Sequence, residues 1–295
     1  MPALTDQFKN HELVVDALTR CNFAPVGTPI TCAVSGGADS MALLVLAVAS
    51  GCAVTAVHVD HGLRPESGHE AIIVRDLAQQ LGAGFAAKTV HVEAGSNLEA
   101  RARDARYAVL PPDVVTGHTA DDQAETVLIN LLRGAGLRGL SGMQPNSQHP
   151  ILKLRRSETH KLCDALKIKI VHDASNDDQK FQRNRIRRDL IPLLDELSKR
   201  DVTALLARQA DVLRDDAELL EQLASHLDPT DAVALTNSPL ALARRAIRAW
   251  IATEHPPDAA TVERVLSVAR GEVTACDIGL GRQVRRSQQR LRIEP

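Results

Sequence analysis

The stretch ITCAVSGGADSMALLVLAVA, residues 30–49, determines how the first half of the chain folds. Residues 30–34 form an apolar, β-branched run, residues 41–49 favour a helix, and SGGADS joins the two. The adjacent glycines Gly36 and Gly37 let the backbone turn sharply and bring its N–H groups close to an anion. The helix that follows directs its unbonded first-turn N–H groups at the same place. The stretch therefore predicts a strand, a phosphate-binding loop and a helix in succession.

The predicted loop differs from the most common phosphate-binding loop. It lacks the Lys-[Ser/Thr] ending of a Walker A motif, but Ser35 and Ser40 supply hydroxyl donors. Asp39 places a carboxylate beside the phosphates, which is favourable only if a divalent cation bridges them, so we expect a Mg²⁺ complex of the nucleotide. A Gly-Gly turn with an ordinary helix N-cap is the simpler alternative. The expected ATP-binding residues are Ser35, Gly36, Gly37, Ala38, Asp39 and Ser40.

SGGADS after ITCAV resembles the pyrophosphate-binding loop of the PP-loop ATPases. The resemblance implies cleavage of ATP between its α and β phosphates and adenylation of a substrate. The motif indicates a superfamily and leaves the substrate open.

Length and composition restrict the class of protein. The 295 residues are enough for a sizeable core and predict two domains. The 44% of hydrophobic residues include no run long enough to cross a bilayer, and the first residues lack a basic-then-apolar signal peptide. We therefore expect a cytoplasmic protein without a membrane partner.

Cysteine, charge and aromatic content narrow the class further. The five cysteines are odd in number and form no C-x-x-C pair, which argues against a disulfide framework and against a zinc or iron–sulfur site. A net charge of −2 excludes a uniformly basic nucleic-acid binder. Because only 2% of the residues are aromatic, any RNA contact should rely on Arg and Lys.

Strand and helix patterns alternate through the first half of the chain. The predicted strands lie at 30–34, 53–59, 85–92 and 113–117, and helical patterns begin at Met41, Ser67, Asn97 and Ala120. This order predicts an α/β fold with a doubly wound parallel sheet. A last strand at 151–154 and a helix at 157–167, capped by Ser157, should follow. Ligands of such sheets bind beyond the carboxyl ends of the strands.

Two groups of residues follow the second and third predicted strands. In HVDHGLR, residues 58–64, the backbone could line an adenine pocket while Arg64 reaches phosphate or RNA, although a polar turn explains the run nearly as well. On the predicted helix 97–110, Arg103 and Arg106 lie three residues apart and can share a face suited to a phosphate backbone. A solvated helix face with local ion pairs is the alternative.

The fourth predicted strand leads into a helix through GHTADDQAET, residues 117–126. Asp122 and Glu125 are three residues apart and share a helix face, and His118 precedes that helix. Such a set could bind a substrate ammonium group, hold magnesium or take a proton from an attacking amine. Acidic residues also suit a first helical turn for its dipole alone.

Positive charge concentrates at residues 183–188, where a helix with apolar positions at Ile186, Leu190, Ile191 and Leu194 is predicted to open. Cations at a helix start oppose its dipole, so the charge favours a substrate or RNA contact. The polar residues of this run are Arg183, Asn184, Arg185, Arg187 and Arg188.

Several runs, in this order, resemble the motifs of the bacterial tRNA(Ile)-lysidine synthase family. They are HVDHGLR, ARDARY, GHTADDQAETVLINLLRGAGLRGLSGM and D-x-S-N-x-D followed by RNRIR, and the resemblance covers roughly residues 25–194. The resemblance implies that ATP adenylates C2 of the wobble cytidine in the CAU-anticodon tRNA(Ile), with release of pyrophosphate. The side-chain amine of L-lysine would then attack C2 and expel AMP.

The resemblance also implies a role for each candidate residue. The residues expected to act in catalysis are Asp39, His118, Asp122, Glu125 and Arg187. Those expected to contact substrate or tRNA are Arg64, Arg103, Arg106, Arg183 and Asn184. Asp122 and Glu125 would bind the lysine ammonium group, and ATP with Mg²⁺ would occupy the loop. The chain departs from the family at Thr119, where a second His is frequent, and at residues 150–154, to which we assign no chemistry.

The last third of the chain is predicted to be mainly helical. Helical periodicity at 201–227, 239–252 and 258–270 is followed by a basic tail that suggests a short β segment able to guide tRNA, or a solvated terminal hairpin. We expect a PP-loop catalytic domain at 1–198 and a smaller helical domain with a basic C-terminal segment at 199–295. The oligomeric state stays open, with a homodimer as one alternative.

Two other functions share features with this sequence. A tRNA 2-thiocytidine synthetase shares the loop and the RNA target, but its sulfur chemistry is associated with paired cysteines that this sequence lacks. An ATP-binding module that recognises tRNA without catalysis is the second alternative. The presence of Asp39, His118, Asp122 and Glu125 argues against it.

Overall fold

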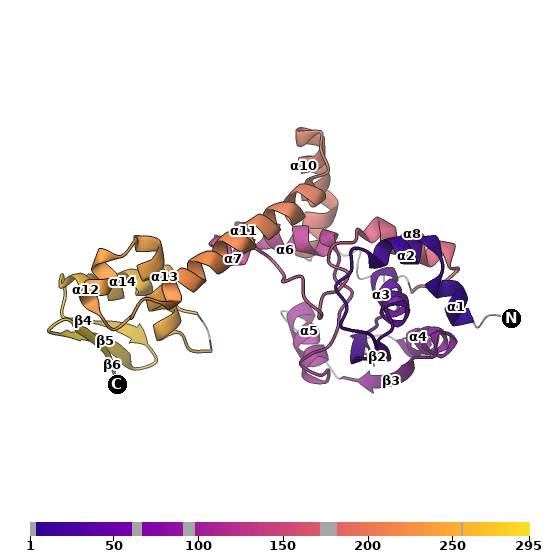
Figure 1. Ribbon diagram of the computed structural model, residues 1–295, viewed down its shortest axis with the longest axis horizontal. Helices are drawn as coiled ribbons and strands as arrows, with labels where there is room; N and C mark the ends of the chain where they lie inside the picture. The colour runs from indigo at the N-terminus through magenta and orange to yellow at the C-terminus, as the bar shows by residue number, and fades with distance from the viewer. Residues whose placement is uncertain (1–3, 61–66, 91–97, 172–181, 255) are drawn as a thin grey trace. The chain divides into compact units, whose positions relative to one another are not determined.

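The computed structural model describes residues 4–60, 67–90, 98–171, 182–254 and 256–295 (Figure 1). Arg64, Asn97 and the predicted loop at 173–178 lie outside these residues, as does the side chain of Arg103. The chain forms two compact units, Met1–Ala210 and Asp211–Pro295. They divide within α11 (Val202–Ser225), whereas the boundary predicted from the sequence lies between 198 and 199.

The first unit contains the predicted parallel sheet. Its strands β1 (Pro29–Ala33), β2 (Ala53–Asp60) and β3 (Gly84–Thr89) lie in that order and are all parallel. On the free edge of β1, Val115 forms an isolated parallel bridge with Cys32. The chain thus crosses back after β3 to the other side of β1, which makes the gap between β1 and residue 115 a topological switch point. The predicted α/β fold class is confirmed.

Two strand predictions need correction. Residues 113–117 form only that isolated bridge, because the N–H of Thr116 leaves the ladder and donates to the Gln148 carbonyl at 2.8 Å, and Pro111 and Pro112 precede the segment. The last strand predicted at 151–154 is wrong. This segment is a series of turns in which the N–H of Leu154 donates to the Ile151 carbonyl.

Helix α3 (Ala38–Ala49) is the centre of the first unit. It is apolar on all sides, and Met41, Leu43, Leu44 and Leu46 are fully buried. The elements that surround it are α1 (Leu4–Lys9), α2 (Glu12–Leu18), α4 (Ser67–Leu81), α8 (Arg156–Ala165) and the sheet. This packing fixes the first turn of α3, which follows the predicted phosphate-binding loop.

The remaining helices of this unit carry the other candidate residues. They are α5 (Leu98–Ala108), α6 (Ala120–Leu132), α7 (Leu137–Leu140), α9 (Gln182–Arg185), the π-helical turn η2 (Ile186–Leu190) and α10 (Ile191–Ser198). The single helix predicted from 183 is therefore interrupted. Pro192 has no N–H to donate, and the N–H of Ile191 bonds to the Ile186 carbonyl five residues back.

The second unit contains short helices and an antiparallel sheet. Its helices are the second part of α11, from Asp211, and α12 (Ala232–Asn237), α13 (Leu240–Ile251) and α14 (Ala259–Arg270). The strands β4 (Ala275–Gly279), β5 (Arg282–Ser287) and β6 (Arg290–Glu294) pair in sequence order. The helices and the sheet share one hydrophobic core, which includes Ile247, Val265 and Val284. No helix in the described part of the chain has both the length and the apolar character needed to cross a membrane.

Candidate active site

The phosphate-binding loop, residues 35–40, is held in shape by its own hydrogen bonds. The N–H of Ser35 donates to Ser40 Oγ at 3.1 Å, and Ser40 Oγ donates to the Gly37 carbonyl at 2.9 Å. Gly36 has a φ of +93°, and a Cβ there would lie 2.8 Å from Val171 Cγ2. The loop therefore needs glycine at this position, and its backbone is set before any ligand binds.

Gly117 brings the segment that follows Val115 against the phosphate-binding loop. A Cβ at Gly117 would lie 2.9 Å from the Asp39 carbonyl oxygen and 3.1 Å from Ser40 Cα. Only glycine permits this approach of two backbones. The approach places His118 and the start of α6 beside the first turn of α3.

A cavity of about 900 Å³ opens at this edge of the sheet. Residues 33–35 and 57–59 at the ends of β1 and β2 form part of its wall. The cavity unites most of the predicted site residues, namely Ser35, Gly37, Ala38, Asp39, Ser40, Arg106, His118, Asp122 and Arg187. Gly36, Glu125, Arg183 and Asn184 are not among its lining residues, but Glu125 and Arg183 are bonded to residues that are.

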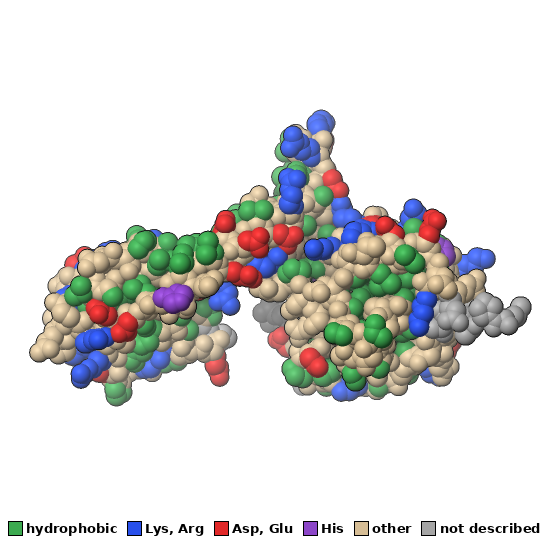
Figure 2. Space-filling model, in the orientation of Figure 1, with side chains coloured by type: hydrophobic (Ala, Val, Ile, Leu, Met, Phe, Trp, Pro, Cys, Tyr) green, Lys and Arg blue, Asp and Glu red, His purple; other side chains and the backbone are tan. Residues whose placement is uncertain are grey.

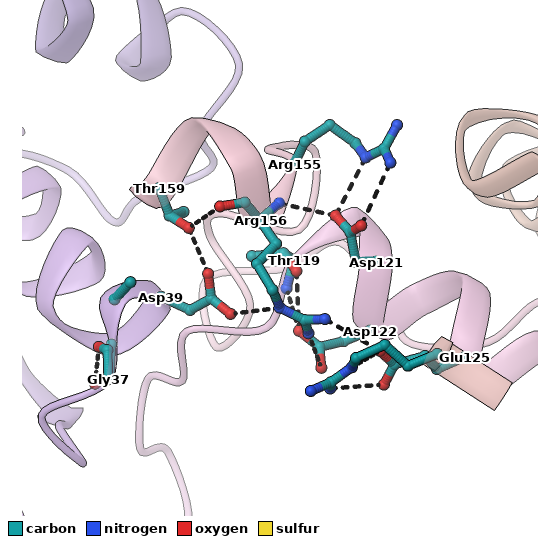
Figure 3. Close-up of polar contacts among 12 residues, drawn as sticks. Gly37, Asp39, Thr119, Asp121, Asp122, Glu125, Arg155, Arg156 and Thr159 are labelled. Carbon is teal, nitrogen blue, oxygen red and sulfur yellow. Dashed lines mark hydrogen bonds and ion pairs between the residues drawn. The ribbon is translucent and has the colours of Figure 1, made fainter. Parts of the chain in front are cut away.

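Arg156, at the start of α8, connects the loop with α6 (Figure 3). Its Nε lies 3.1 Å from Asp39 Oδ2, its Nη2 3.1 Å from Asp122 Oδ1 and its Nη1 3.2 Å from Glu125 Oε1. Thr159 donates a hydrogen bond to the other oxygen of Asp39. One guanidinium group thus bonds three carboxylates from two helices.

Two further arginines complete what we call the arginine–carboxylate cluster. Arg183 Nε lies 2.7 Å from Glu125 Oε2, and Arg187 Nε lies 2.7 Å from Glu125 Oε1. Glu125 is fully buried, so its charge would be very costly without these partners. The cluster consists of three anions and three cations: Asp39, Asp122, Glu125, Arg156, Arg183 and Arg187.

Apolar packing holds the arginine segment against α6. Ile186 and Ile191 of η2 and α10 pack in one core with Ala124 and Leu128 of α6. Arg183 and Arg187 flank Ile186 in the sequence. Because Ile186 packs against α6, both arginines reach Glu125 on that helix.

Burial and the arginines of the cluster together shift the pKa values of two carboxyl groups in opposite directions. Burial raises the pKa of Asp39, and Arg156 and Thr159 offset this only in part. Burial also acts to raise the pKa of Asp122, but Arg156 and Arg183 outweigh it and lower that pKa to about 2. Asp122 is therefore held as an anion by the cluster, whereas Asp39 is less favourable in its ionised form.

Comparisons with known proteins show the family of this chain. Residues 11–194 match the family model described as a PP-loop domain, and residues 231–292 match the TilS substrate binding domain. The tRNA(Ile)-lysidine synthase of Nocardia farcinica is 41% identical over 239 residues, which cover 75% of this chain and 75% of that protein. The synthase of Mycolicibacterium paratuberculosis is 43% identical over 234 residues, covering 74% and 73%.

The chain belongs to the tRNA(Ile)-lysidine synthase family. It is accordingly an ATP-dependent ligase of the tRNA-modifying class, as the resemblance of its motifs implies. Among solved structures, the U34-tRNA thiolase NcsA from Methanococcus maripaludis gives a TM-score of 0.52 at 15% identity, covering 72% of this chain and 79% of that one. That likeness shows the fold alone.

Arg156 is the residue of this candidate site that the sequence analysis missed. It follows residues 150–154, to which no chemistry was assigned, and Ser157 was expected to cap the next helix. The helix instead begins at Arg156, with the N–H of Arg155 donating to Glu158 Oε2 at 2.8 Å. Two adjacent arginines at a helix start oppose its dipole, which is the signal that singled out residues 183–188 and could have found this pair.

His118 lies in a small polar group beside the cluster. Thr116 Oγ1 is 2.7 Å from His118 Nδ1 and 2.8 Å from His149 Nδ1, and the two Nδ1 atoms are 3.3 Å apart. Thr116 has a single hydroxyl proton, so it can donate to only one of the two rings. This arrangement fixes the orientation of His118 at the cavity wall.

Thr119, one of the positions at which the sequence departs from the resemblance, has a structural role. Its N–H and its Oγ1 both donate to Asp122 Oδ2, at 2.9 and 3.0 Å. These bonds leave Asp122 Oδ1 to face Arg156 and Arg183. Thr119 therefore orients one carboxylate of the cluster.

The cysteines offer no support for sulfur chemistry. Cys32, Cys52 and Cys163 are buried, and burial raises the pKa of Cys32 and of Cys163 to about 12. All five thiols are free, and Cys163 Sγ donates to the Ala38 carbonyl next to the loop. Neutral thiols are poor nucleophiles and poor metal ligands, so Cys32 and Cys163 are unsuited to sulfur chemistry.

Proposed function

We propose that the chain makes lysidine in the CAU-anticodon tRNA(Ile) in two steps. The C2 oxygen of the wobble cytidine attacks the α-phosphorus of ATP and pyrophosphate leaves. The ε-amine of L-lysine then attacks C2, AMP leaves with that oxygen, and the new C–N bond is completed by loss of a proton. The observation that carries the proposal is one cavity that joins a phosphate-binding loop to the arginine–carboxylate cluster in a chain of this family.

The phosphate-binding loop supplies the nucleotide half of the proposed site. Residues 35–40 would hold the phosphates through the unbonded first-turn N–H groups of α3 and the Ser35 hydroxyl. The Ser40 hydroxyl would donate to them only after giving up its bond to the Gly37 carbonyl. No group of three or more His, Cys, Asp or Glu side chains in the described ranges could hold a metal ion. Asp39 alone, together with phosphate oxygens, fits the way in which Mg²⁺ binds with nucleotides. When bound, the ion would neutralise charge on the phosphates.

The arginine–carboxylate cluster supplies the lysine half. Asp122 and Glu125 bind the lysine ammonium group only after guanidinium groups leave them, because three cations already balance the three anions. ATP phosphates carry the charge that attracts Arg156 away. We therefore infer an ordered reaction, in which nucleotide binding opens the cluster and lysine binds second.

The RNA half rests on basic residues outside the cluster. Arg106 lines the cavity, and Arg64, Arg103 and Asn184 are assigned to the tRNA by their motifs. Figure 2 shows Lys and Arg side chains along the segment that carries α10, where Arg185, Arg188, Lys199 and Arg200 are exposed. The TilS substrate binding domain at 231–292 is expected to add the contacts that select this tRNA. The cytoplasmic location and the oligomeric state remain predictions.

A lysine-transfer assay tests the function. Purified protein should transfer labelled lysine to the CAU-anticodon tRNA(Ile) only with ATP and Mg²⁺, and hardly to the CAU-anticodon tRNA(Met). Asp39→Asn should weaken tRNA-dependent ATP–pyrophosphate exchange, whereas Asp122→Asn should mainly raise the KM for lysine. Asp113→Asn, an exposed carboxylate, is the matched control. Absence of transfer while tRNA binding is intact refutes the enzyme proposal, and equal losses for both variants in both assays refute the division of roles.

A further inference from the structure

His149 is a histidine beside the candidate site that the sequence analysis did not single out. Its ring meets that of His118 nearly at a right angle, with the ring centroids 5.0 Å apart. Thr116 Oγ1 lies 2.7 Å from His118 Nδ1 and 2.8 Å from His149 Nδ1. The Gln148 carbonyl oxygen, at 3.3 Å, is a more distant partner for the same hydroxyl. The Thr116 hydroxyl therefore links the two rings.

The hydrogens of this group, which we call the His–Thr–His chain, can be arranged in few ways. The two Nδ1 atoms are 3.3 Å apart, where two N–H groups would repel but one N–H and one lone pair are compatible. When His118 Nδ1 carries the hydrogen, it donates to Thr116 Oγ1, and the Thr116 hydroxyl donates to His149 Nδ1. Nε2 of the neutral His118 ring then presents a lone pair. In this arrangement His118 can act as a base through Nε2.

The two rings border different cavities. His118 and Thr116 line the cavity of about 900 Å³ that contains the candidate site, whereas His149 lines a second cavity of about 260 Å³. Asn22 and Lys153 also line the second cavity and are exposed, so solvent reaches it. The His–Thr–His chain thus runs from the candidate site to a cavity that water can enter.

The charges around His118 favour a proton on its ring. His118 interacts electrostatically with Asp122, and this interaction helps to lower the pKa of the Asp122 carboxyl group. By the same interaction, the Asp122 anion stabilises a positive charge on His118. The other charged and titratable groups that line this cavity belong to the arginine–carboxylate cluster or are Glu70, Arg106, Tyr107, His160 and Arg188.

The second cavity has charges of both signs near His149. Its cations are Arg20 and Lys153, and two carboxylates bond Arg20 at 2.8 Å, namely those of Asp16 and Glu158. Burial raises the pKa of the Cys21 thiol, which also lines this cavity, to about 12, so the thiol is neutral. These charges balance, and water in the cavity can solvate a positive charge on the His149 ring.

We propose that His149 makes His118 the base that takes the proton from the lysine amine as the C–N bond forms. The inference rests on the proposed function, since it concerns the proton lost in the second step. The N–H bond of the amine breaks as His118 Nε2 takes the proton. The Nδ1 hydrogen of His118 moves to Thr116 Oγ1 and the hydroxyl hydrogen moves to His149 Nδ1, so the positive charge comes to lie beside the second cavity. After the product leaves, these hydrogens move back and His118 Nε2 loses its proton to water. His149 acts through His118 and is a positioning residue.

Lysine transfer in a single turnover, with enzyme in excess over tRNA and with saturating ATP and lysine, tests this inference. His149→Ala should slow the transfer about tenfold, because the protonated base loses a hydrogen-bond partner. The tRNA-dependent ATP–pyrophosphate exchange, which precedes the proton loss, should keep its wild-type rate. Added imidazole should restore lysine transfer in His149→Ala, and more so as pH rises through about 7, since the neutral ring is the form that accepts a hydrogen.

His149→Phe keeps an aromatic ring beside His118 but has no nitrogen. It should be as slow as His149→Ala, and imidazole should not restore it because the phenyl ring fills the space. Its lysine transfer should reach half its maximal rate at a lower pH than that of the wild type, because the protonated base has lost stabilisation. Asn22→Ala changes an exposed residue of the second cavity and is the matched control. It should behave as the wild type with and without imidazole.

Three results would overturn the inference. They are a wild-type rate in His149→Phe, no effect of imidazole on folded His149→Ala, and an equal loss of ATP–pyrophosphate exchange, which would mean that His149 acts on the fold or on the nucleotide site. If His149→Ala does not fold, His149→Phe decides through its rate and its pH profile. Absence of lysine transfer by the wild type would refute the proposed function instead.

Discussion

The phosphate-binding loop and the arginine–carboxylate cluster both contribute residues to one cavity but are built in different ways. The loop uses backbone groups and small side chains, and hydrogen bonds within residues 35–40 hold it. The cluster uses six charged side chains that bond one another. The loop is thus ready for phosphate, whereas the cluster must exchange internal ion pairs for substrate contacts. This difference explains why the proposed reaction binds nucleotide before lysine.

The largest expected effect comes from breaking the cluster at its most buried member. Glu125→Ala removes a fully buried anion that bonds Arg156, Arg183 and Arg187. Loss of one partner from a buried ion pair costs about 3–5 kcal/mol of unfolding free energy. Urea unfolding at pH 7 measures this cost. Glu196→Ala, on an exposed face of α10, should change stability by less than about 0.5 kcal/mol. A similar small change for Glu125→Ala would mean that the cluster does not stabilise the fold.

A smaller effect is expected from the loop. Gly117→Ala forces a Cβ to within 2.9 Å of the Asp39 carbonyl, and backbone shifts of this kind cost about 1–3 kcal/mol. Because the displaced atoms belong to the first turn of α3, the KM for ATP should rise while the KM for lysine changes little. Steady-state kinetics with each substrate varied separately measures the two values.

Gly136→Ala is the control for this substitution. Its added methyl group meets no atom within 4 Å, so the KM for ATP should stay at its wild-type value. An equal rise of both KM values in Gly117→Ala would show that the loop and the cluster cannot be disturbed separately.

The same difference explains what the sequence could predict. The loop is contiguous, so its glycines, its serines and the strand and helix around it were all readable from residues 30–49. Asp122 and Glu125 were readable as a pair on one helix face. Their ion-pair partners could not be predicted from the sequence, because Arg156 and Arg183 lie 34 and 61 residues away from Asp122. Periodicity reports which face a residue occupies and gives no information on which distant charge will neutralise it.

The fold errors have a similar origin. The apolar run at 113–117 reads as a strand, but the competing Gln148 carbonyl takes the N–H of Thr116 and stops the ladder. The helix predicted from residue 183 is present, but it contains a π-helical turn before Pro192, where the N–H of Ile191 bonds to the Ile186 carbonyl. In both cases a tertiary or backbone constraint overrides the local pattern.

The smallest expected effect is that of Asp39, and it is measured against the effect of its neighbour in the cluster, Asp122. The pKa of Asp122 is lowered to about 2, so its ionisation stabilises the folded chain above the unfolded pKa of 3.8, and this contribution is lost as pH falls towards 2. Asp122→Asn should therefore lose about 2 kcal/mol at pH 7. The pKa of Asp39 is raised, so its ionisation costs stability as pH rises through that pKa. Asp39→Asn should slightly increase stability at pH 7 while it reduces adenylation.

Urea unfolding of the wild type and both variants between pH 3 and pH 7 measures how the free energy of unfolding of each depends on pH. The wild type should have a larger free energy of unfolding than Asp122→Asn at pH 7, and this difference should shrink as pH falls below about 4. Asp39→Asn should become more stable than the wild type as pH rises. Both carboxylates bond Arg156 at 3.1 Å, so loss of an Arg156 contact alone would destabilise both variants. If only Asp39→Asn gains stability, the fold is more stable without the charge of Asp39. This carboxylate, which lies where the loop meets the cluster, would then be kept charged for its ligand.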